Sequence, residues 1–346
     1  MTKEQFDILK AAAEGKTKKL PVALIVDSPW IPGFVGIKPI EYFTEPEIWL
    51  SANLEVVRRF PQVIFIPGFW VEYGMAVEPS AFGCKISWWN DSPPSVTPVL
   101  RDISEVDSLS VPLPKYDGLM PFVLHLQRWV QQRIEPLGYS IRIVAARGPL
   151  TLAVHLRGVT DFLTDIKIAP EESHRFLEIC TQTVIKWLSA QIENLPYVEG
   201  ILVLDDIVGL LSPTDYDVFA HPYLSQVFGA FPSMLKIYHN DANILPFAER
   251  LAEAGFHILN FSHEIDIGEL AARVGQRVAL MGNVPPLEVL AKGSADDVRR
   301  FAAQCIEKSR ARFILSAGGG TSPGTPAENI DALIAASEEV SVRRSA

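Results

Sequence analysis

Short apolar runs recur along the chain, and each is followed by polar or glycine residues and then by a segment with helical periodicity. Runs of this length, rich in valine, isoleucine and leucine, are typical of buried parallel strands. Eight are found: Pro21–Val26, Val63–Pro67, Arg142–Ala146, Ile201–Leu204, Met234–Tyr238, His257–Phe261, Arg277–Met281 and Phe313–Ser316. A strand followed by a helix, eight times over, predicts an α/β fold of the (β/α)8 TIM-barrel type, with its chemistry at the carboxyl ends of the strands.

The pattern predicts a single domain, residues 1–346, because barrels of this class often exceed about 250 residues. Residues 1–20 are expected to form an N-terminal helical extension. The segment 68–115 follows the second strand and contains tryptophans and prolines without a helical period, which indicates a long insertion or lid. Residues 340–346 are expected to form a frayed tail.

Composition narrows the classes of partner and compartment. The 31 basic and 41 acidic residues give a net charge of −10 without a basic run, so nucleic acid is not an expected partner. The chain has neither an apolar run long enough to span a membrane nor the apolar stretch of a signal peptide, which favours a cytoplasmic protein. Cys84, Cys180 and Cys305 lie far apart, so neither a disulfide scaffold nor a thiolate zinc site is expected.

A histidine and an aspartate follow the fifth predicted strand. His239 and Asp241 flank one residue, so on an extended segment their side chains point the same way and could share a cation or a proton. These two are the predicted metal ligands, and zinc or a harder divalent ion would suit them. The candidates for a third ligand are Glu72, Asp206, His263 and Glu264. The alternative is that His239 only hydrogen-bonds a carboxylate and binds no metal.

Two adjacent carboxylates end the fourth strand, and an arginine ends the third. Because neighbouring side chains alternate in direction, one of Asp205 and Asp206 should face the cavity, where it could manage a proton, while the other caps a helix. Arg147 could clamp a carboxylate or phosphate of the substrate, or it could pair with Asp205. The predicted catalytic residues are therefore Asp205, Asp206, His239 and Arg147.

Further residues at the strand ends are candidates for contacting a small-molecule substrate. The aromatic ones suit a flat apolar substrate, although packing under a long loop also explains them. The glycine run after the eighth strand resembles a phosphate cradle, or it serves only for tight passage of the chain. The predicted substrate-binding residues are Asp27, Trp30, Trp70, Glu72, Tyr73, Asn283, Gly318 and Gly319.

An ordered set of segments resembles the uroporphyrinogen decarboxylase (URO-D) superfamily and covers nearly the whole chain. The segments are Gly148 to Ala153, Leu204-Asp205-Asp206 with Leu211-Ser212-Pro213, Tyr238 to Asn243, Met281 to Pro286, and Leu315 to Ile330. The resemblance implies the same barrel. It also implies one of two chemistries, which are cofactor-free decarboxylation of a porphyrinogen and zinc-dependent methyl transfer involving corrinoids.

Departures from the family pattern bear on that choice. The decarboxylases open with an arginine-rich motif that binds the macrocycle's acidic arms, whereas Pro21–Trp30 contains no arginine. The methyltransferase branch is more similar, in Glu41-Tyr42-Phe43, Phe82 to Lys85 and the strand-five segment. Its zinc ligands are one histidine and two cysteines. Here His239 is kept, but Asp241 and Gly319 stand where the cysteines fall, which argues against thiol activation by the familiar site.

The resemblance therefore implies a methyltransferase that moves a methyl group from a small donor, such as an aromatic ether or amine, to a corrinoid protein or a thiol acceptor, with zinc assisting. One alternative is a cofactor-free decarboxylase or lyase in which Arg147 holds a carboxylate and His239 protonates the carbanion. Another is a non-catalytic barrel that binds a tetrapyrrole or corrinoid. The chain lacks the Asp-x-His-x-x-Gly signature of a corrinoid domain, so any corrinoid is expected on a partner protein. Family members are commonly dimers, which implies a homodimer.

Overall fold

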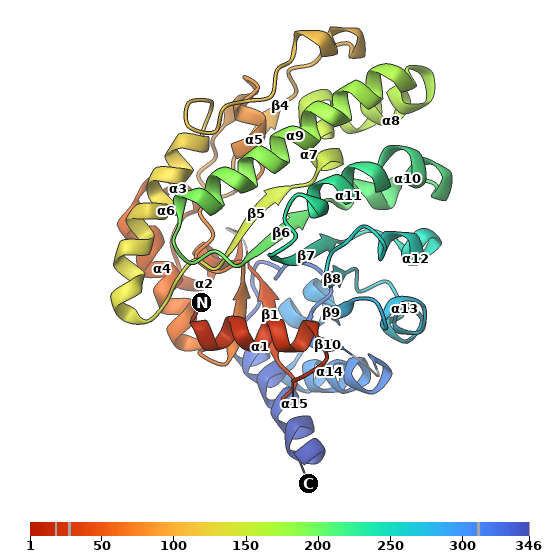
Figure 1. Ribbon diagram of the computed structural model, residues 1–346. Helices are drawn as coiled ribbons and strands as arrows, with labels where there is room; N and C mark the ends of the chain where they lie inside the picture. The colour runs from red at the N-terminus through yellow and green to blue at the C-terminus, as the bar shows by residue number, and fades with distance from the viewer. Residues whose placement is uncertain (18, 27–28, 310–311, 346) are drawn as a thin grey trace.

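The computed structural model describes residues 1–17, 19–26, 29–309 and 312–345. Eight parallel strands form a nearly closed barrel in the order β2-β1-β10-β9-β8-β7-β6-β5, surrounded by helices (Figure 1). The strands are β1 (Val22–Ile25), β2 (Val63–Ile66), β5 (Ile143–Arg147), β6 (Gly200–Leu204), β7 (Leu235–Asn240), β8 (Ile258–Phe261), β9 (Ala279–Val284) and β10 (Phe313–Ala317). Each overlaps one predicted apolar run, so the (β/α)8 prediction is confirmed.

The helices lie outside the strands, apart from one that covers an end of the barrel. They are α1 (Lys3–Ala13), α2 (Trp30–Val35), α3 (Pro39–Thr44), α4 (Pro46–Arg59), α5 (Val77–Ser80), α6 (Met120–Ile134), α7 (Pro149–Arg157), α8 (Val159–Ile168), α9 (Pro170–Asn194), α10 (Pro213–Phe219), α11 (His221–Gly229), α12 (Ala248–Leu251), α13 (Ile267–Val274), α14 (Ala295–Ser309) and α15 (Ala327–Ser345). The alanine- and glutamate-rich α15 continues to Ser345, so the predicted tail, residues 340–346, overlaps its last residues, and fraying there stays a prediction. None of the helices described is long and apolar enough to span a membrane.

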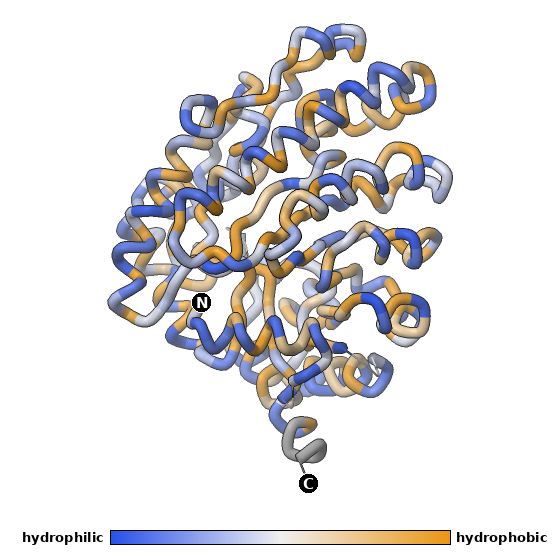
Figure 2. The backbone as a smooth tube through the Cα atoms, viewed as in Figure 1, coloured by the Kyte–Doolittle hydropathy of each residue, from blue (hydrophilic) through white to orange (hydrophobic). Residues whose placement is uncertain are grey.

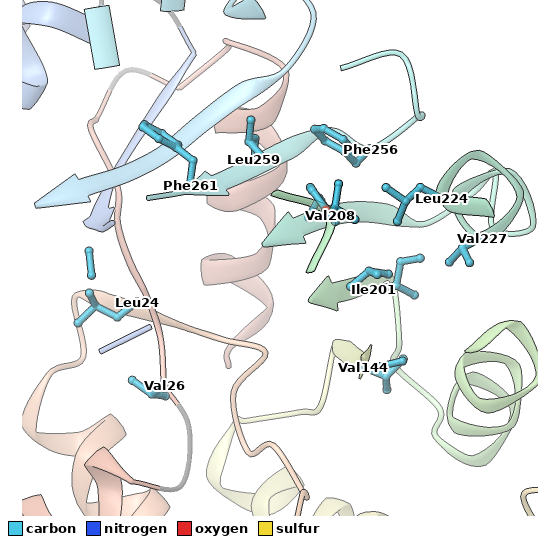
Figure 3. Packing of buried hydrophobic residues seen from close by; sticks show 14 of the residues in the cluster. Leu24, Val26, Val144, Ile201, Val208, Leu224, Val227, Phe256, Leu259 and Phe261 are labelled. Atoms are coloured by element: carbon cyan, nitrogen blue, oxygen red, sulfur yellow. The ribbon is translucent and has the colours of Figure 1, made fainter. Parts of the chain in front are cut away.

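Alternating side chains of the strands serve two separate apolar layers. In β1, Val22 and Leu24 point outward and pack against the helices, whereas Ala23 and Ile25 fill the barrel interior. The outer layer is illustrated in Figure 3, where Ile201 of β6 lies near side chains of α11. Along the surrounding helices, apolar and polar segments alternate, as expected for helices with one buried face (Figure 2).

The predicted N-terminal helix α1 lies across the amino-terminal end of the barrel (Figure 1). Its side chains Phe6 and Leu9 are buried in the same apolar cluster as the barrel interior. The opposite end, formed by the carboxyl ends of the strands, is therefore the end at which loops and polar side chains gather.

The strands β2 and β5 stand at the two ends of the strand order, and side chains from the surrounding helices contact the facing edge of each. On the β5 edge, Gln191 of α9 donates to the carbonyl of Ala145 (3.0 Å), and Glu78 of α5 accepts from the N–H of Arg147 (2.9 Å). On the β2 edge, Gln5 of α1 donates to the carbonyl of Val63 (3.1 Å). These contacts satisfy backbone groups that an eighth strand pairing, between β2 and β5, would otherwise occupy.

The segment 68–115, predicted as an insertion, contains α5, a small antiparallel pair of β3 (Lys85–Ser87) and β4 (Ser95–Thr97), and the 3-10 helix η1 (Ile103–Ser108). It is fastened to α7, because the N–H groups of Val99 and Leu100 both donate to the carbonyl of Leu156 (3.0 and 2.9 Å). Its role as a lid stays a prediction.

Candidate metal centre

Three side chains that follow β6 and β7 converge at the mouth of the barrel. Asp206 is the first residue of η3 (Asp206–Leu210), His239 lies in β7, and Asp241 follows β7 directly. Nε2 of His239 is 3.7 Å from Oδ1 of Asp206 and 3.6 Å from Oδ2 of Asp241. One ligand atom from each residue lies within 4.8 Å of the others, which is a spacing that a single divalent ion can bridge.

Asn260 of β8 fixes the orientation of the histidine. Its Nδ2 donates to the carbonyls of Met281 (2.8 Å) and Ala317 (3.1 Å), so its Oδ1 must face Nδ1 of His239, at 2.7 Å. Nδ1 therefore carries the proton and donates it to Asn260. In the neutral imidazole, Nε2 consequently presents its lone pair to the two aspartates.

Three electron-pair donors thus face one another with no hydrogen between them. Their mutual repulsion is relieved either by a proton on His239 or by a cation in the space between them. Burial opposes charge on the imidazole, but Asp241 and Asp206 outweigh it, and the pKa of His239 is raised. Desolvation also raises the pKa of Asp241, an effect that the imidazole opposes. The imidazole is buried, whereas Asp206 and Asp241 keep 42% and 46% of their side-chain exposure, so the group is open on the carboxylate side.

The structure resolves which of the adjacent aspartates faces the mouth. Asp205 is fully buried and points away from it, accepting hydrogen bonds from the N–H groups of Leu150 (3.1 Å) and Thr151 (2.8 Å) and from the Thr151 hydroxyl (2.8 Å). It caps the N-terminus of α7. Burial raises the pKa of Asp205 to about 7, against the effect of those three donors. Gly148 is required beside it, because a Cβ there would lie 2.3 Å from the Asp205 carboxylate.

Arg147 does not pair with Asp205, as one interpretation of the sequence expected. Its guanidinium is buried, donating to Glu72 (3.0 Å) and to the carbonyl of Gly74 (3.1 Å), and it lies 4.9 Å from the ring centre of Trp70. The pairing follows from the open barrel edge, where the loop after β2 replaces a strand beside β5. Three predicted site residues, Arg147, Glu72 and Trp70, therefore form one ion-paired cluster.

The glycine run packs against the metal-ligand group. A Cβ on Gly319 would lie 2.5 Å from Oδ1 of Asp241, and the φ of +120° at this residue is one that glycine adopts most easily. Gly318 abuts the backbone of His263 in the same way. The N–H of Gly318 donates to Val284, that of Gly320 hydrogen-bonds Asp241, and that of Thr321 donates to Ile25. These three donors are thus occupied, which disfavours a phosphate cradle.

The remaining predicted substrate contacts lie elsewhere. Trp30 is fully buried and donates to the carbonyl of Thr325 (3.0 Å), so it belongs to the core. Tyr73 packs edge-on against Trp88 in the insertion. Asn283 donates to the carbonyls of Ser262 and Ile265, which belong to the loop after β8. Asp27 lies outside the described residues.

Two candidate functional residues, Asn260 and Glu78, were not predicted from the sequence. Asn260 occupies an inward position of β8, in register with His239. The sequence contained one indication of its role, because Asn260 is a polar residue inside the apolar run His257–Phe261. Glu78, which binds the backbone of Arg147, lies in a segment without periodicity, and nothing in the local pattern singles it out.

Comparisons with known proteins agree with this architecture. Curated relatives named uroporphyrinogen decarboxylase include those of Synechococcus sp. (strain CC9605), 28% identical over 261 residues with 71% of both chains covered, and of Xylella fastidiosa, 24% identical over 317 residues with 86% of both covered. The solved structure of a methyltransferase from Methanosarcina mazei superposes with a TM-score of 0.84 at 24% identity, covering 97% of this chain and 98% of its own. At that identity the likeness supports the fold.

A model of the uroporphyrinogen decarboxylase (URO-D) family matches residues 5–340, which is nearly the whole chain. The predicted resemblance is thereby confirmed, and the protein belongs to the uroporphyrinogen decarboxylase family.

Proposed function

We propose that this protein is a metal-assisted methyltransferase, which moves a methyl group from a small ether or amine donor to a corrinoid protein or a thiol acceptor. The observation that carries the proposal is the lone pair on Nε2 of His239, directed by Asn260 toward Asp206 and Asp241. Such a group fits a divalent cation, because with a neutral imidazole it directs three electron-pair donors at one space.

The donor set indicates which ion would fit. One imidazole and two carboxylates suit zinc and also harder ions such as manganese or iron(II), and the set contains no thiolate. His239, Asp206 and Asp241 would be the ligands. When bound, such an ion acts as a Lewis acid, which withdraws charge from the oxygen or nitrogen that loses the methyl group.

The chain's own residues complete the site. Asn260 keeps the imidazole in one tautomer, and the backbone N–H of Asp241 donates to Oδ1 of Asp206 (2.7 Å), which holds the Asp206 carboxylate beside the end of β7. Loops that leave β2, β6 and β9 carry the exposed apolar side chains Met75, Leu210 and Leu287. Apolar side chains around the mouth favour a partner large enough to cover it, as a corrinoid protein would be.

The names of the curated relatives favour a second candidate, a cofactor-free decarboxylase acting on a carboxylic acid. That reaction needs a cation to hold the carboxylate. Arg147 is 6% exposed and already paired with Glu72, so a substrate carboxylate would have to displace a buried partner. This arrangement weakens the second candidate.

Metal binding is the first test. Purified protein would be incubated with zinc, manganese or iron(II), gel-filtered and analysed by mass spectrometry of the elements. We expect a stoichiometric amount of one of these ions in the wild type and its loss in Asp206→Asn and Asp241→Asn. The control Glu264→Gln, which changes an exposed carboxylate in the loop after β8, should keep the ion. Substoichiometric metal in the wild type would refute the proposal.

Methyl transfer is the second test. Methoxybenzoates and methylamines would be offered with cob(I)alamin as the acceptor, and methylcobalamin would be followed by absorbance. Turnover that requires metal supports the proposal. Metal-independent release of carbon dioxide from uroporphyrinogen, without methylcobalamin, would support the decarboxylase instead.

A further inference from the structure

A cavity of about 620 Å³ lies at the end of the barrel opposite the metal-ligand group. It is open to solvent and is lined by α1 and by the segments that enter β6, β7, β8 and β10. Its volume lies within the range of small-molecule sites. The lining residues are Phe6, Lys10, Ala13, Glu14, Lys16, Val198, Glu199, Pro232, Ser233, Met234, Leu235, His257 and Arg312, and we call it the basal cavity.

The lining of the basal cavity combines apolar and polar side chains, and its charge balance is positive. Of the two acidic residues, Glu14 pairs with Lys16 (2.8 Å) and Glu199 pairs with Arg142. Within the described ranges, Lys10 and Arg312 have no acidic partner within ion-pair distance. Two cations at a cavity of mixed polarity therefore remain available for an anion.

Lys10 and Arg312 are placed so that a single ligand in the basal cavity could contact both. Arg312 immediately precedes β10, and its side chain lies against Gly15, where a Cβ would come within 3.1 Å of Cγ. Lys10 lies on α1, which brings the two charges to the same cavity from different elements. A ligand held by both would tie α1 to the barrel.

A histidine adds a donor to the same lining. Nδ1 of His257 accepts the N–H of Lys236 (3.0 Å), so in the neutral ring the proton is on Nε2. The basal cavity therefore offers an ammonium group, a guanidinium group and an imidazole N–H together with the apolar side chains Phe6, Met234 and Leu235. That combination recognises the head and the body of an amphipathic anion.

We infer that the basal cavity binds a small organic anion, with a carboxylate or phosphate group at Lys10 and Arg312 and an apolar or aromatic body against Phe6, Met234 and Leu235. This site is independent of the proposed methyl transfer. Because α1 covers the barrel interior, the bound anion holds that helix in place, and its binding raises the thermal stability of the protein.

The probes are phenyl phosphate and benzoate, which share the apolar ring and differ in the anionic group, and binding is measured by calorimetry and by thermal unfolding of the full chain. We expect at least one of them to bind and raise the melting temperature, and the tighter one identifies the head group. Arg312→Gln and Lys10→Gln should each weaken binding about ten-fold. Lys3→Gln, on α1 but paired with Asp7 outside the cavity, should bind like the wild type.

One further variant and one further probe locate the site. Asp241→Asn at the barrel mouth should leave the affinity for the probes unchanged. The inference is overturned if neither probe binds, if Arg312→Gln and Lys10→Gln both bind like the wild type, or if Asp241→Asn abolishes binding. Benzyl alcohol, which has the ring without the charge, should bind far more weakly, and equal affinity would also overturn the inference.

Discussion

The side chain of Asn260 holds the ring of His239 through a hydrogen bond of 2.7 Å, and the same amide is locked by two backbone carbonyls. The residue that sets the tautomer is thus itself immobilised by the backbone of β9 and the end of β10. In protein metal sites, partners of this kind orient the ligand and raise its basicity.

We therefore expect Asn260→Ala to reduce metal affinity by about 10- to 100-fold, because Nδ1 of His239 loses its acceptor. The substitution also leaves two buried carbonyls without a donor, which costs about 1–3 kcal/mol each. Asn53→Ala is the matched control, since Asn53 is a buried amide in α4 that donates to Tyr42 and Trp49. Calorimetric titration with zinc distinguishes the two. Equal affinities in both variants would show that Asn260 is only structural.

A methyl group at Gly319 should disturb Asp241. We expect Gly319→Ala to weaken metal binding at least about ten-fold, because the new Cβ would overlap the Asp241 carboxylate. Gly320→Ala is the control, since a Cβ there meets no atom within 4 Å. If both variants bound metal like the wild type, Asp241 would not be a ligand.

The ion pair of Arg147 and Glu72 is buried, with 7% and 5% of the two side chains exposed. Removing one partner leaves an uncompensated charge, so Glu72→Gln should lower the free energy of unfolding by about 3–5 kcal/mol. Asp7→Asn breaks the exposed pair with Lys3 and should cost less than about 1 kcal/mol. Urea unfolding measures both. A small effect of Glu72→Gln would mean that Arg147 is free to bind substrate.

His155 of α7 should make the fold sensitive to acid. Burial, aided by the charge of Arg147, lowers its pKa from 6.5 to about 4. Between pH 6.5 and pH 4, His155 therefore binds a proton in the unfolded chain but not in the folded chain. Its contribution to the free energy of unfolding is fully present above pH 6.5 and is lost as the pH falls toward 4. Between pH 7 and pH 5 the expected loss is about 2 kcal/mol. His155→Gln should remove this part of the loss, whereas His125→Gln, on the exposed face of α6, should not. Identical pH profiles for wild type and His155→Gln would contradict the assignment.

The strands could be predicted because each is a short apolar run bounded by polar residues, a pattern that does not depend on distant contacts. Helix bounds could be predicted less well, because periodicity alone does not show where a helix breaks. The stretch Pro213–Ala230 has one continuous period but forms α10 and α11, which break at Ala220 before Pro222 because proline has no N–H to donate within a helix.

At the site, local spacing predicted that His239 and Asp241 act together. The roles of Asp205 and Asp206 could not be assigned, because alternation allows either, and the deciding contacts are with Leu150 and Thr151, more than fifty positions away. The partner of Arg147 lies 75 positions away in a loop without periodicity. Local pattern contains no information on such pairs.

The edge between β2 and β5 has a consequence for how the barrel can change. Elsewhere around the ring, neighbouring strands are joined by backbone groups, which substitutions other than to proline leave in place. At this edge, backbone groups of the two strands are instead held by the side chains Gln191, Glu78 and Gln5. Single substitutions at these three positions can therefore alter the contacts of this edge while the paired strands keep their register.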